Sequence, residues 1–171
     1  MAVRPIRLLG DPVLRQRAKR VPQVDASVQR LIDDMIDSMR EASGVGLAAP
    51  QIGVSLRVIV IEVPDEEVVA LINPEIVKRS GQRRLEEGCL SIPGYRAEVP
   101  RSVNVLVKGL DRQGRPVRIK AKDDLLAHAL EHEIDHINGV LYIDHLESLD
   151  ELVRIEPEPG GEEEEEVVAG L

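Results

Sequence analysis

Apolar positions along the chain predict two helices. Between residues 25 and 41 they recur at spacings of three and four, which places one apolar stripe along a helix of 3.6 residues per turn. Asp25 is expected to cap this helix, because its carboxylate can accept from the free N–H groups of the first turn. A second helix is predicted over 123–138, where two aspartates favour the positive N-terminal end and Gly139 allows the left-handed conformation that ends a helix.

Strands are predicted between these helices. Segments rich in β-branched residues are 56–63, 68–72, 103–110 and 116–121. The last two flank a four-residue link, 111–114, that ends in Gly and is typical of a hairpin turn. The segment 86–94 is too interrupted by Gly and Pro to predict a plain strand. Because strands and helices do not alternate regularly, we expect an α+β fold with mixed or antiparallel sheets packed around the second helix.

Composition limits the class of protein. The single Cys excludes an intrachain disulfide framework. The absence of a run of about 18 apolar residues argues against a membrane span. The first ten residues lack the long apolar region of a signal peptide, so we expect a cytoplasmic protein. Aromatic residues make up only 1% of the chain, and the core must therefore be built from Val, Leu, Ile and Ala.

The net charge of −9 is concentrated at one end of the chain. Residues 156–171 contain seven Glu and no basic residue, and without them the remaining 24 acidic and 22 basic residues give −2. We therefore expect a single catalytic domain over 1–155 and an acidic, disordered tail over 156–171. Neither part has the basic excess that is typical of a general nucleic-acid binder.

The second helix contains His132-Glu133-Ile134-Asp135-His136. Residues four apart lie one above the other on a helix, so the two imidazoles can face one metal ion. Glu133 lies at the edge of the same face, near enough to take a proton from a water beside that ion. We interpret His128 and His145, which lie outside this motif, as structural or surface residues.

A catalytic metal typically has three protein ligands and one open position, so a third ligand is needed. Tyr142 stands where one metalloprotease pattern has a His, three residues after Gly139, but a phenol is a poor substitute. Glu147 as the third metal ligand would make the site similar to that of a protease. Cys89, the only thiol, follows a Gly that leaves room for close approach, and its sulfur can bind as a thiolate. A thiolate with two imidazoles suits Zn, Fe(II), Co or Ni.

The segment 44–53 contains three Gly and one Pro among apolar residues. It predicts neither a continuous helix or strand nor a solvated linker, and it indicates that some group approaches the backbone closely. It is not a phosphate-binding loop, because the required Lys and Ser or Thr are missing. Tight structural packing alone also explains such a segment.

Three motifs together resemble the peptide deformylase family of the bacterial type. In chain order they are 44–51 (GVGLAAPQ), 87–91 (EGCLS) and 132–136 (HEIDH), and the likeness covers about residues 5–150. The resemblance implies an α+β fold with the motif helix at its centre. It also implies a metal-dependent hydrolase that removes the N-formyl group from the formyl-methionine of newly made polypeptides and releases formate.

The resemblance further implies roles for individual residues. The expected catalytic set comprises the metal ligands Cys89, His132 and His136, the general acid/base Glu133, and the oxyanion donors Gln51 and the Leu90 backbone N–H. The implied ion is Fe(II), with Zn, Ni or Co possible in a preparation. The expected substrate contacts are Gly46 to the peptide backbone, a methionine slot of Val45, Leu125 and Ala129 with His128 at its rim, and Arg96 on the peptide or in a surface salt bridge.

Two positions depart from the family pattern. Glu131 stands where the family commonly has Gln, and we expect it beside the site or on the surface. Some family members end in a basic helix thought to dock on the ribosome, whereas the five consecutive Glu of this chain would be repelled by RNA phosphates. We therefore expect formyl-methionyl peptides as partners, with transient ribosome proximity, no stable nucleic-acid binding and no membrane.

Two other hypotheses use the same residues. A zinc protease would cleave internal peptide bonds and take Glu147 as its third ligand. A non-enzymatic module would use the helix as a scaffold and the acidic tail as a contact, and would hold no stoichiometric metal.

Overall fold

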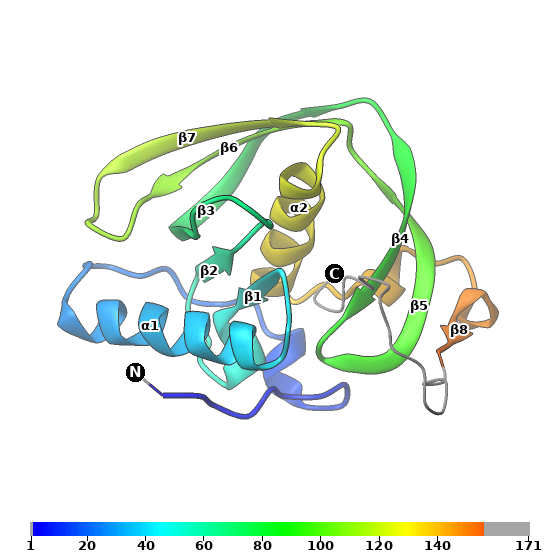
Figure 1. The fold of residues 1–171 in the computed structure, drawn as a ribbon, viewed down its shortest axis with the longest axis horizontal. Helices are drawn as coiled ribbons and strands as arrows, with labels where there is room; N and C mark the ends of the chain where they lie inside the picture. The colour runs from blue at the N-terminus through cyan, green and yellow to red at the C-terminus, as the bar shows by residue number, and fades with distance from the viewer. Residues whose placement is uncertain (1, 156–171) are drawn as a thin grey trace.

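The computed structural model describes residues 2–155, and the tail predicted over 156–171 lies outside the described residues (Figure 1). The helices are α1 (Ala26–Glu41) and α2 (Leu125–Ile137), with short 3-10 helices η1 (Pro12–Arg15), η2 (Ala49–Ile52), η3 (Tyr142–His145) and η4 (Leu149–Glu151). The strands are β1 (Gly46–Ala48), β2 (Val58–Ile61), β3 (Val69–Ser80), β4 (Arg83–Cys89), β5 (Ile92–Arg101), β6 (Asn104–Leu110), β7 (Pro116–Lys122) and β8 (Val153–Arg154).

The strands form two antiparallel sheets. The first has the order β1-β2-β3-β6-β7 and the second the order β4-β5-β8, and α2 lies between them (Figure 1). This arrangement confirms the expected α+β fold. Among residues 2–155, no helix has the length and apolar character needed to cross a bilayer.

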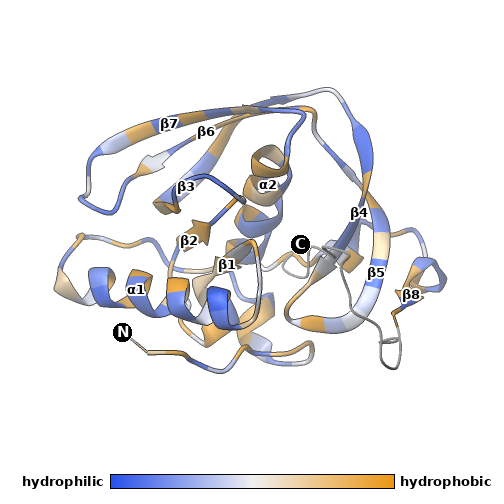
Figure 2. Cartoon of the chain, viewed as in Figure 1, coloured by the Kyte–Doolittle hydropathy of each residue, from blue (hydrophilic) through white to orange (hydrophobic). Residues whose placement is uncertain are grey.

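The five-stranded sheet is covered by a helix on each face. Successive residues of β2 point to opposite sides, so Val58 and Val60 pack in the cluster that contains α1, while Ile59 and Ile61 pack in the cluster that contains α2. Burial on both faces explains why β2 has a continuous apolar run instead of alternating polar and apolar positions (Figure 2).

Both predicted helices are confirmed, together with their ends. Asp25 caps α1 by accepting from the backbone N–H groups of its first turn. Asp124 caps α2 in the same way, with its Oδ1 2.8 Å from the Ala127 nitrogen. Gly139 has a φ of +78°, and a Cβ there would lie 2.7 Å from the Arg15 carbonyl oxygen. The chain can turn away from α2 at this point only because Gly139 has no side chain.

Residues 86–94 do not form one plain strand, as predicted, but the sequence did not indicate the hairpin that they form, with the end of β4, a turn at 90–91 and the start of β5. Two irregularities of the backbone accommodate the glycines of this hairpin. The register shifts between Glu87 and Cys89, and Gly94 takes a φ of +86° within β5. A bulged antiparallel pair does not show the regular alternation by which a strand is recognised.

Strand β3 is also longer than predicted and continues through Asn73 and Pro74. Its register with β6 shifts between Ile72 and Glu75. Asn73 has a φ of +53°, and its side-chain amide bonds the backbone N–H and carbonyl of Val21 at 2.8 and 2.9 Å. The Asn73 side chain thus compensates for the interruption of the strand at Asn73 and Pro74, which the sequence alone indicates as a strand end.

Candidate metal centre

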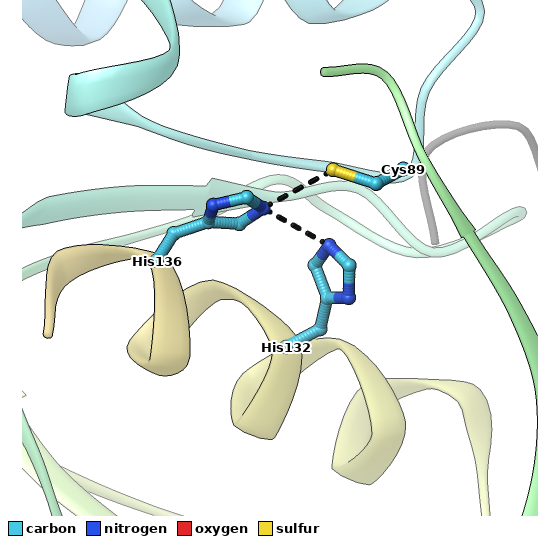
Figure 3. A group of neighbouring side chains, drawn as sticks. All are labelled: Cys89, His132 and His136. Atoms are coloured by element: carbon cyan, nitrogen blue, oxygen red, sulfur yellow. Dashed lines mark hydrogen bonds between the residues drawn. The ribbon is translucent and has the colours of Figure 1, made fainter. Parts of the chain in front are cut away.

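Three potential metal-binding side chains meet between the two sheets (Figure 3). Cys89 ends β4, whereas His132 and His136 lie one turn apart on α2. The Cys89 Sγ is 3.3 Å from the His136 Nε2, which is 3.1 Å from the His132 Nε2. All three side chains are buried, and their ligand atoms lie within 4.8 Å of one another.

This donor set fits a divalent transition metal. Sulfur and nitrogen ligands of a tetrahedral ion lie about 2.0–2.3 Å from it, which places them roughly 3.3–3.6 Å from each other. The separations of 3.1 and 3.3 Å are close to that range. One thiolate and two imidazoles leave one position of a four-coordinate ion open, as a catalytic site requires.

Glu87 orients one of the two histidines. Its buried carboxylate accepts from the His132 Nδ1 at 2.6 Å and from the His128 Nε2 at 2.6 Å. Arg101 donates to both oxygens of the same carboxylate, at 2.8 and 2.6 Å. The Nδ1 proton of His132 is thereby held by Glu87, and the Nε2 lone pair faces Cys89 and His136.

A chain of charged side-chain contacts leads from Glu87 toward the surface. Burial alone raises the pKa of Glu87, but His132, His128 and Arg101 outweigh it and hold that pKa well below its usual range. Arg101 also pairs with Asp135 at 2.8 Å, and Asp135 contacts the His145 Nε2 at 2.8 Å. These contacts keep Glu87 ionised and fixed, as a partner of a metal-ligating His must be.

Glu133 is fully buried next to these ligands, and no hydrogen-bond partner is found for either of its carboxylate oxygens within residues 2–155. Burial raises the pKa of Glu133 to about 8, with His132 opposing and Glu87 adding to the rise. A buried carboxyl group without a partner is costly for a fold, which makes Glu133 a candidate for a functional role.

The Gly-rich segment provides the space that Glu133 occupies. A Cβ on Gly46 would lie 2.5 Å from the Glu133 Oε2, so the group that approaches this backbone is the Glu133 carboxylate. The close approach predicted for 44–53 is thus confirmed, and the segment itself forms β1 followed by η2.

We expect Gly46→Ala to lower kcat/KM about 10- to 100-fold without loss of metal, because the methyl group displaces Glu133 from its position. Formate release and metal content of the purified variant measure the two effects. Gly109→Ala is the matched control, since its Cβ would crowd the Ile72 carbonyl oxygen at 3.1 Å and affect stability instead of rate. A wild-type rate in Gly46→Ala would show that Glu133 does not need this position.

Gln51 is fixed beside the sulfur. Its Oε1 accepts from the Ala48 N–H at 3.0 Å, which turns its Nε2 toward the Ser91 Oγ at 3.1 Å and the Cys89 Sγ at 3.7 Å. Leu90 follows Cys89 in the turn between β4 and β5. The side-chain amide and this turn therefore lie next to the same ligand.

The residues predicted for substrate contact are only partly brought together. Val45 and Leu125 line one pocket of about 550 Å³, whereas Ala129 is fully buried in the core. The Arg96 Nε lies 2.9 Å from the Glu86 Oε1, an ion pair of the kind that we gave as an alternative. His128 is buried against Glu87, in agreement with its interpretation as a structural residue.

The remaining candidates are not part of the ligand group. Glu147 is exposed, and Tyr142 stacks on His132 with ring centroids 6.5 Å apart. Glu131 is buried and accepts from the Ser102 N–H at 2.6 Å, so it anchors α2 and does not lie on the surface. Sequence reasoning missed Glu87 and Arg101 as a buried pair, and the only signal was an acidic residue within the EGCLS motif.

Comparison with known families supports this geometry. Residues 3–152 match the family model described as polypeptide deformylase. The chain belongs to this family. The enzyme is therefore a metal-dependent hydrolase that removes the N-formyl group from newly made polypeptides. The resemblance found in the three sequence motifs is confirmed.

Individual family members are similar over nearly the whole chain. A peptide deformylase of Dehalococcoides mccartyi strain CBDB1 is 57% identical over 159 residues, which cover 92% of this chain and 95% of the relative. A crystal structure of a peptide deformylase from Legionella pneumophila superposes with a TM-score of 0.84 at 51% identity, covering 88% and 89% of the two chains. A structure of the Synechococcus elongatus enzyme in complex with actinonin gives 0.82 at 44% identity, covering 85% and 80%.

Proposed function

We propose that Cys89, His132 and His136 hold one divalent cation at which the formyl group of a formyl-methionyl peptide is hydrolysed. The convergence of these three buried donors carries the proposal. When bound, the cation supplies Lewis acidity and lowers the pKa of water toward neutrality. Release of formate from formyl-Met-Ala-Ser by the metal-loaded enzyme, and its loss after chelation, tests the proposal.

Glu133 acts as the general acid and base in this proposal. Its carboxylate takes a proton as water attacks the formyl carbon, and it returns the proton to the leaving amine of methionine. Its burial and its unpartnered oxygens support this role, because a carboxyl group with a raised pKa can both accept and donate near neutral pH.

Gln51 and the Leu90 N–H stabilise the negative charge that develops on the formyl oxygen. The Gln51 amide is held in place before the reaction by Ala48, so no reorganisation is needed when the charge appears. Its Nε2 lies beside the Cys89 sulfur and is thus close to the position at which the formyl group reacts. Loss of one such donor typically costs about 10²–10³ in rate.

The methionine side chain enters the pocket that Val45 and Leu125 line, with Ala129 behind them in the core. Gly46 lies next to Glu133 and contacts the substrate backbone. Arg96 holds the peptide further along only if its ion pair with Glu86 opens. The formyl carbon carries only hydrogen, so the reacting centre can be narrow and the side chain needs a separate slot; in this pocket the apolar part is formed by Val45, Val63 and Leu125, and charged side chains line much of the rest.

Fe(II) is the native ion in this proposal, with Zn, Ni or Co able to occupy the same ligands. An iron enzyme loses activity in air, because both thiolate and iron oxidise. Activity and metal content compared after aerobic and anaerobic preparation test the assignment. Since the substrates are newly made polypeptides, we place the activity in the cytoplasm with transient ribosome proximity.

We expect Glu87→Gln to weaken metal binding about 10- to 100-fold, because an amide no longer compensates Arg101 or holds the Nδ1 proton of His132 equally well. Competition with a chelator of known affinity measures the change. Glu86→Gln is the matched control, since this neighbouring side chain is 68% exposed. Equal metal affinities of the two variants would contradict a role of Glu87 in orienting the ligand.

A further inference from the structure

A concave surface next to α2 gathers positive charge in a chain whose net charge is −9. Its cavity of about 590 Å³ is lined by five basic side chains and a single acidic one: Arg17, Arg20, Arg57, Arg79, Lys108 and Glu75. The residues come from the segment before α1, the segment before β2, and the strands β3 and β6. The fold thus brings together a basic cluster that composition alone does not reveal.

Part of this charge has no carboxylate partner. Lys108 pairs with Glu75 at 3.4 Å, and Arg79 pairs with the buried Glu131 at 3.2 Å. Among the ion pairs found over residues 2–155, none involves Arg17, Arg20 or Arg57.

Arg57 is fixed at the base of the cavity instead. Its guanidinium donates to the Ile137 carbonyl oxygen at 2.9 Å and to the Asn138 Oδ1 at 2.8 Å. Burial, together with Arg17 and Arg20, lowers the pKa of Arg57, and the Glu75 carboxylate only partly opposes this shift. Like charges held together in this way are stabilised by an anion that contacts all of them.

The cavity continues into a second depression of about 700 Å³, with which it shares Arg20, Asn73, Glu75 and Lys108. Arg118 lines this depression but not the first cavity. The two depressions together form one groove, called the basic groove below, which is longer than a single anion requires. No aromatic side chain lines it in the described part of the chain.

Composition led us to expect no stable nucleic-acid binding, but it does not show this local cluster, and we propose that the basic groove binds the phosphate backbone of a folded RNA. Guanidinium groups match phosphate geometry and are only weakly hydrated, so an Arg-rich groove suits a row of phosphates. Bases are usually read by stacking on aromatic rings, and the lack of such rings favours contact with the backbone alone. The substrates of the enzyme are newly made polypeptides, which appear beside RNA.

The groove and the metal centre face in opposite directions. Ile134 of α2 and Asn138, which caps the helix, line the groove, whereas His132 and His136 point to the metal centre. A helix advances about 100° per residue, so Ile134 and Asn138 lie roughly on the opposite face from the two histidines. RNA bound in the groove therefore leaves the formyl site accessible.

Fluorescence anisotropy with a labelled RNA hairpin and the full-length, metal-loaded enzyme tests the proposal. We expect affinity to fall about 10²-fold or more between roughly 50 and 200 mM salt if about four phosphates are contacted. The double variant Arg17→Gln with Arg20→Gln should weaken binding about tenfold at low salt and reduce the salt slope by about 2. Both side chains are exposed, so the fold is retained.

The control is Arg30→Gln with Arg115→Gln, which makes the same change of net charge outside the groove and should bind like wild type. Equal weakening by both double variants, or no hairpin binding, overturns the proposal. Stronger binding of polyglutamate than of the hairpin at the same salt concentration would indicate an acidic peptide instead, and displacement of the hairpin by inorganic phosphate at constant ionic strength would indicate a simple anion cleft; either result also overturns the proposal.

Formate release from a free formyl peptide separates this inference from the proposed catalytic residues. We expect wild-type release by the Arg17→Gln, Arg20→Gln variant, because the groove does not contact the metal centre. A reduced rate for the free peptide would contradict the separation of the two faces. Loss of RNA binding with normal formate release supports the groove and leaves the catalytic assignment unaffected.

Discussion

Replacing Glu133 with alanine is expected to lower kcat/KM for formyl-Met-Ala-Ser by about 10³-fold or more, while the metal content stays unchanged. The carboxylate is buried, and hydrogen-bond partners within the described residues are lacking for both of its oxygens, so its removal breaks no hydrogen bond within residues 2–155. What is lost is the group that moves the proton from the attacking water to the leaving amine. Formate release and elemental analysis of the same preparation measure rate and metal.

Glu133→Gln tests the same role without the loss of packing that alanine causes. The amide keeps the size and shape of the side chain beside Gly46 but cannot take up the proton, so we expect a similar loss of rate. Thermal melting of both variants checks that the fold is intact. If either variant retains the wild-type rate with its metal bound, Glu133 is not the base.

Replacing Cys89 with alanine is expected to remove the metal from the purified enzyme, and activity with it. The sulfur is the only thiol donor of the chain and lies 3.3 Å from the His136 Nε2. Loss of a direct ligand should weaken binding by more than the about 10- to 100-fold typical of an outer partner. Chelator competition measures the affinity.

Glu147→Ala is the matched control, because a protease-like centre would use this carboxylate as its third ligand. We expect the control to retain metal and rate, since Glu147 is exposed and lies outside the group of converging donors. The opposite pattern, with metal retained in Cys89→Ala and lost in Glu147→Ala, would refute the ligand set proposed above.

Local signals predicted the helices and several of the strands. The stripe in α1, its cap at Asp25 and the turn at Gly139 each depend on residues within a few positions of one another, and all are confirmed. The hairpin of β4 and β5 was missed because its bulge removes the alternation on which strand prediction depends. The extension of β3 beyond Asn73 was missed because a distant backbone at Val21 satisfies that residue.

In the candidate site, too, local spacing predicts some features and misses those that depend on long-range contacts. The spacing of His132 and His136 predicts a shared face, and the structure places the Cys89 sulfur beside it. The partners of Glu87 lie 14 to 45 positions away along the chain, so no spacing rule indicates that one carboxylate contacts Arg101, His128 and His132. Long-range hydrogen bonds of this kind become visible only once the strands and α2 are placed in space.

The position of the three donors affects the thermodynamic stability of the enzyme. Cys89 belongs to the three-stranded sheet, whereas both histidines belong to the helix that covers the five-stranded sheet. An ion held by all three is therefore a crosslink between the two halves of the molecule, and its binding free energy adds to the stability of their union. Binding of the cofactor and stability of the tertiary structure are therefore thermodynamically coupled, and removal of the ion should lower the melting temperature.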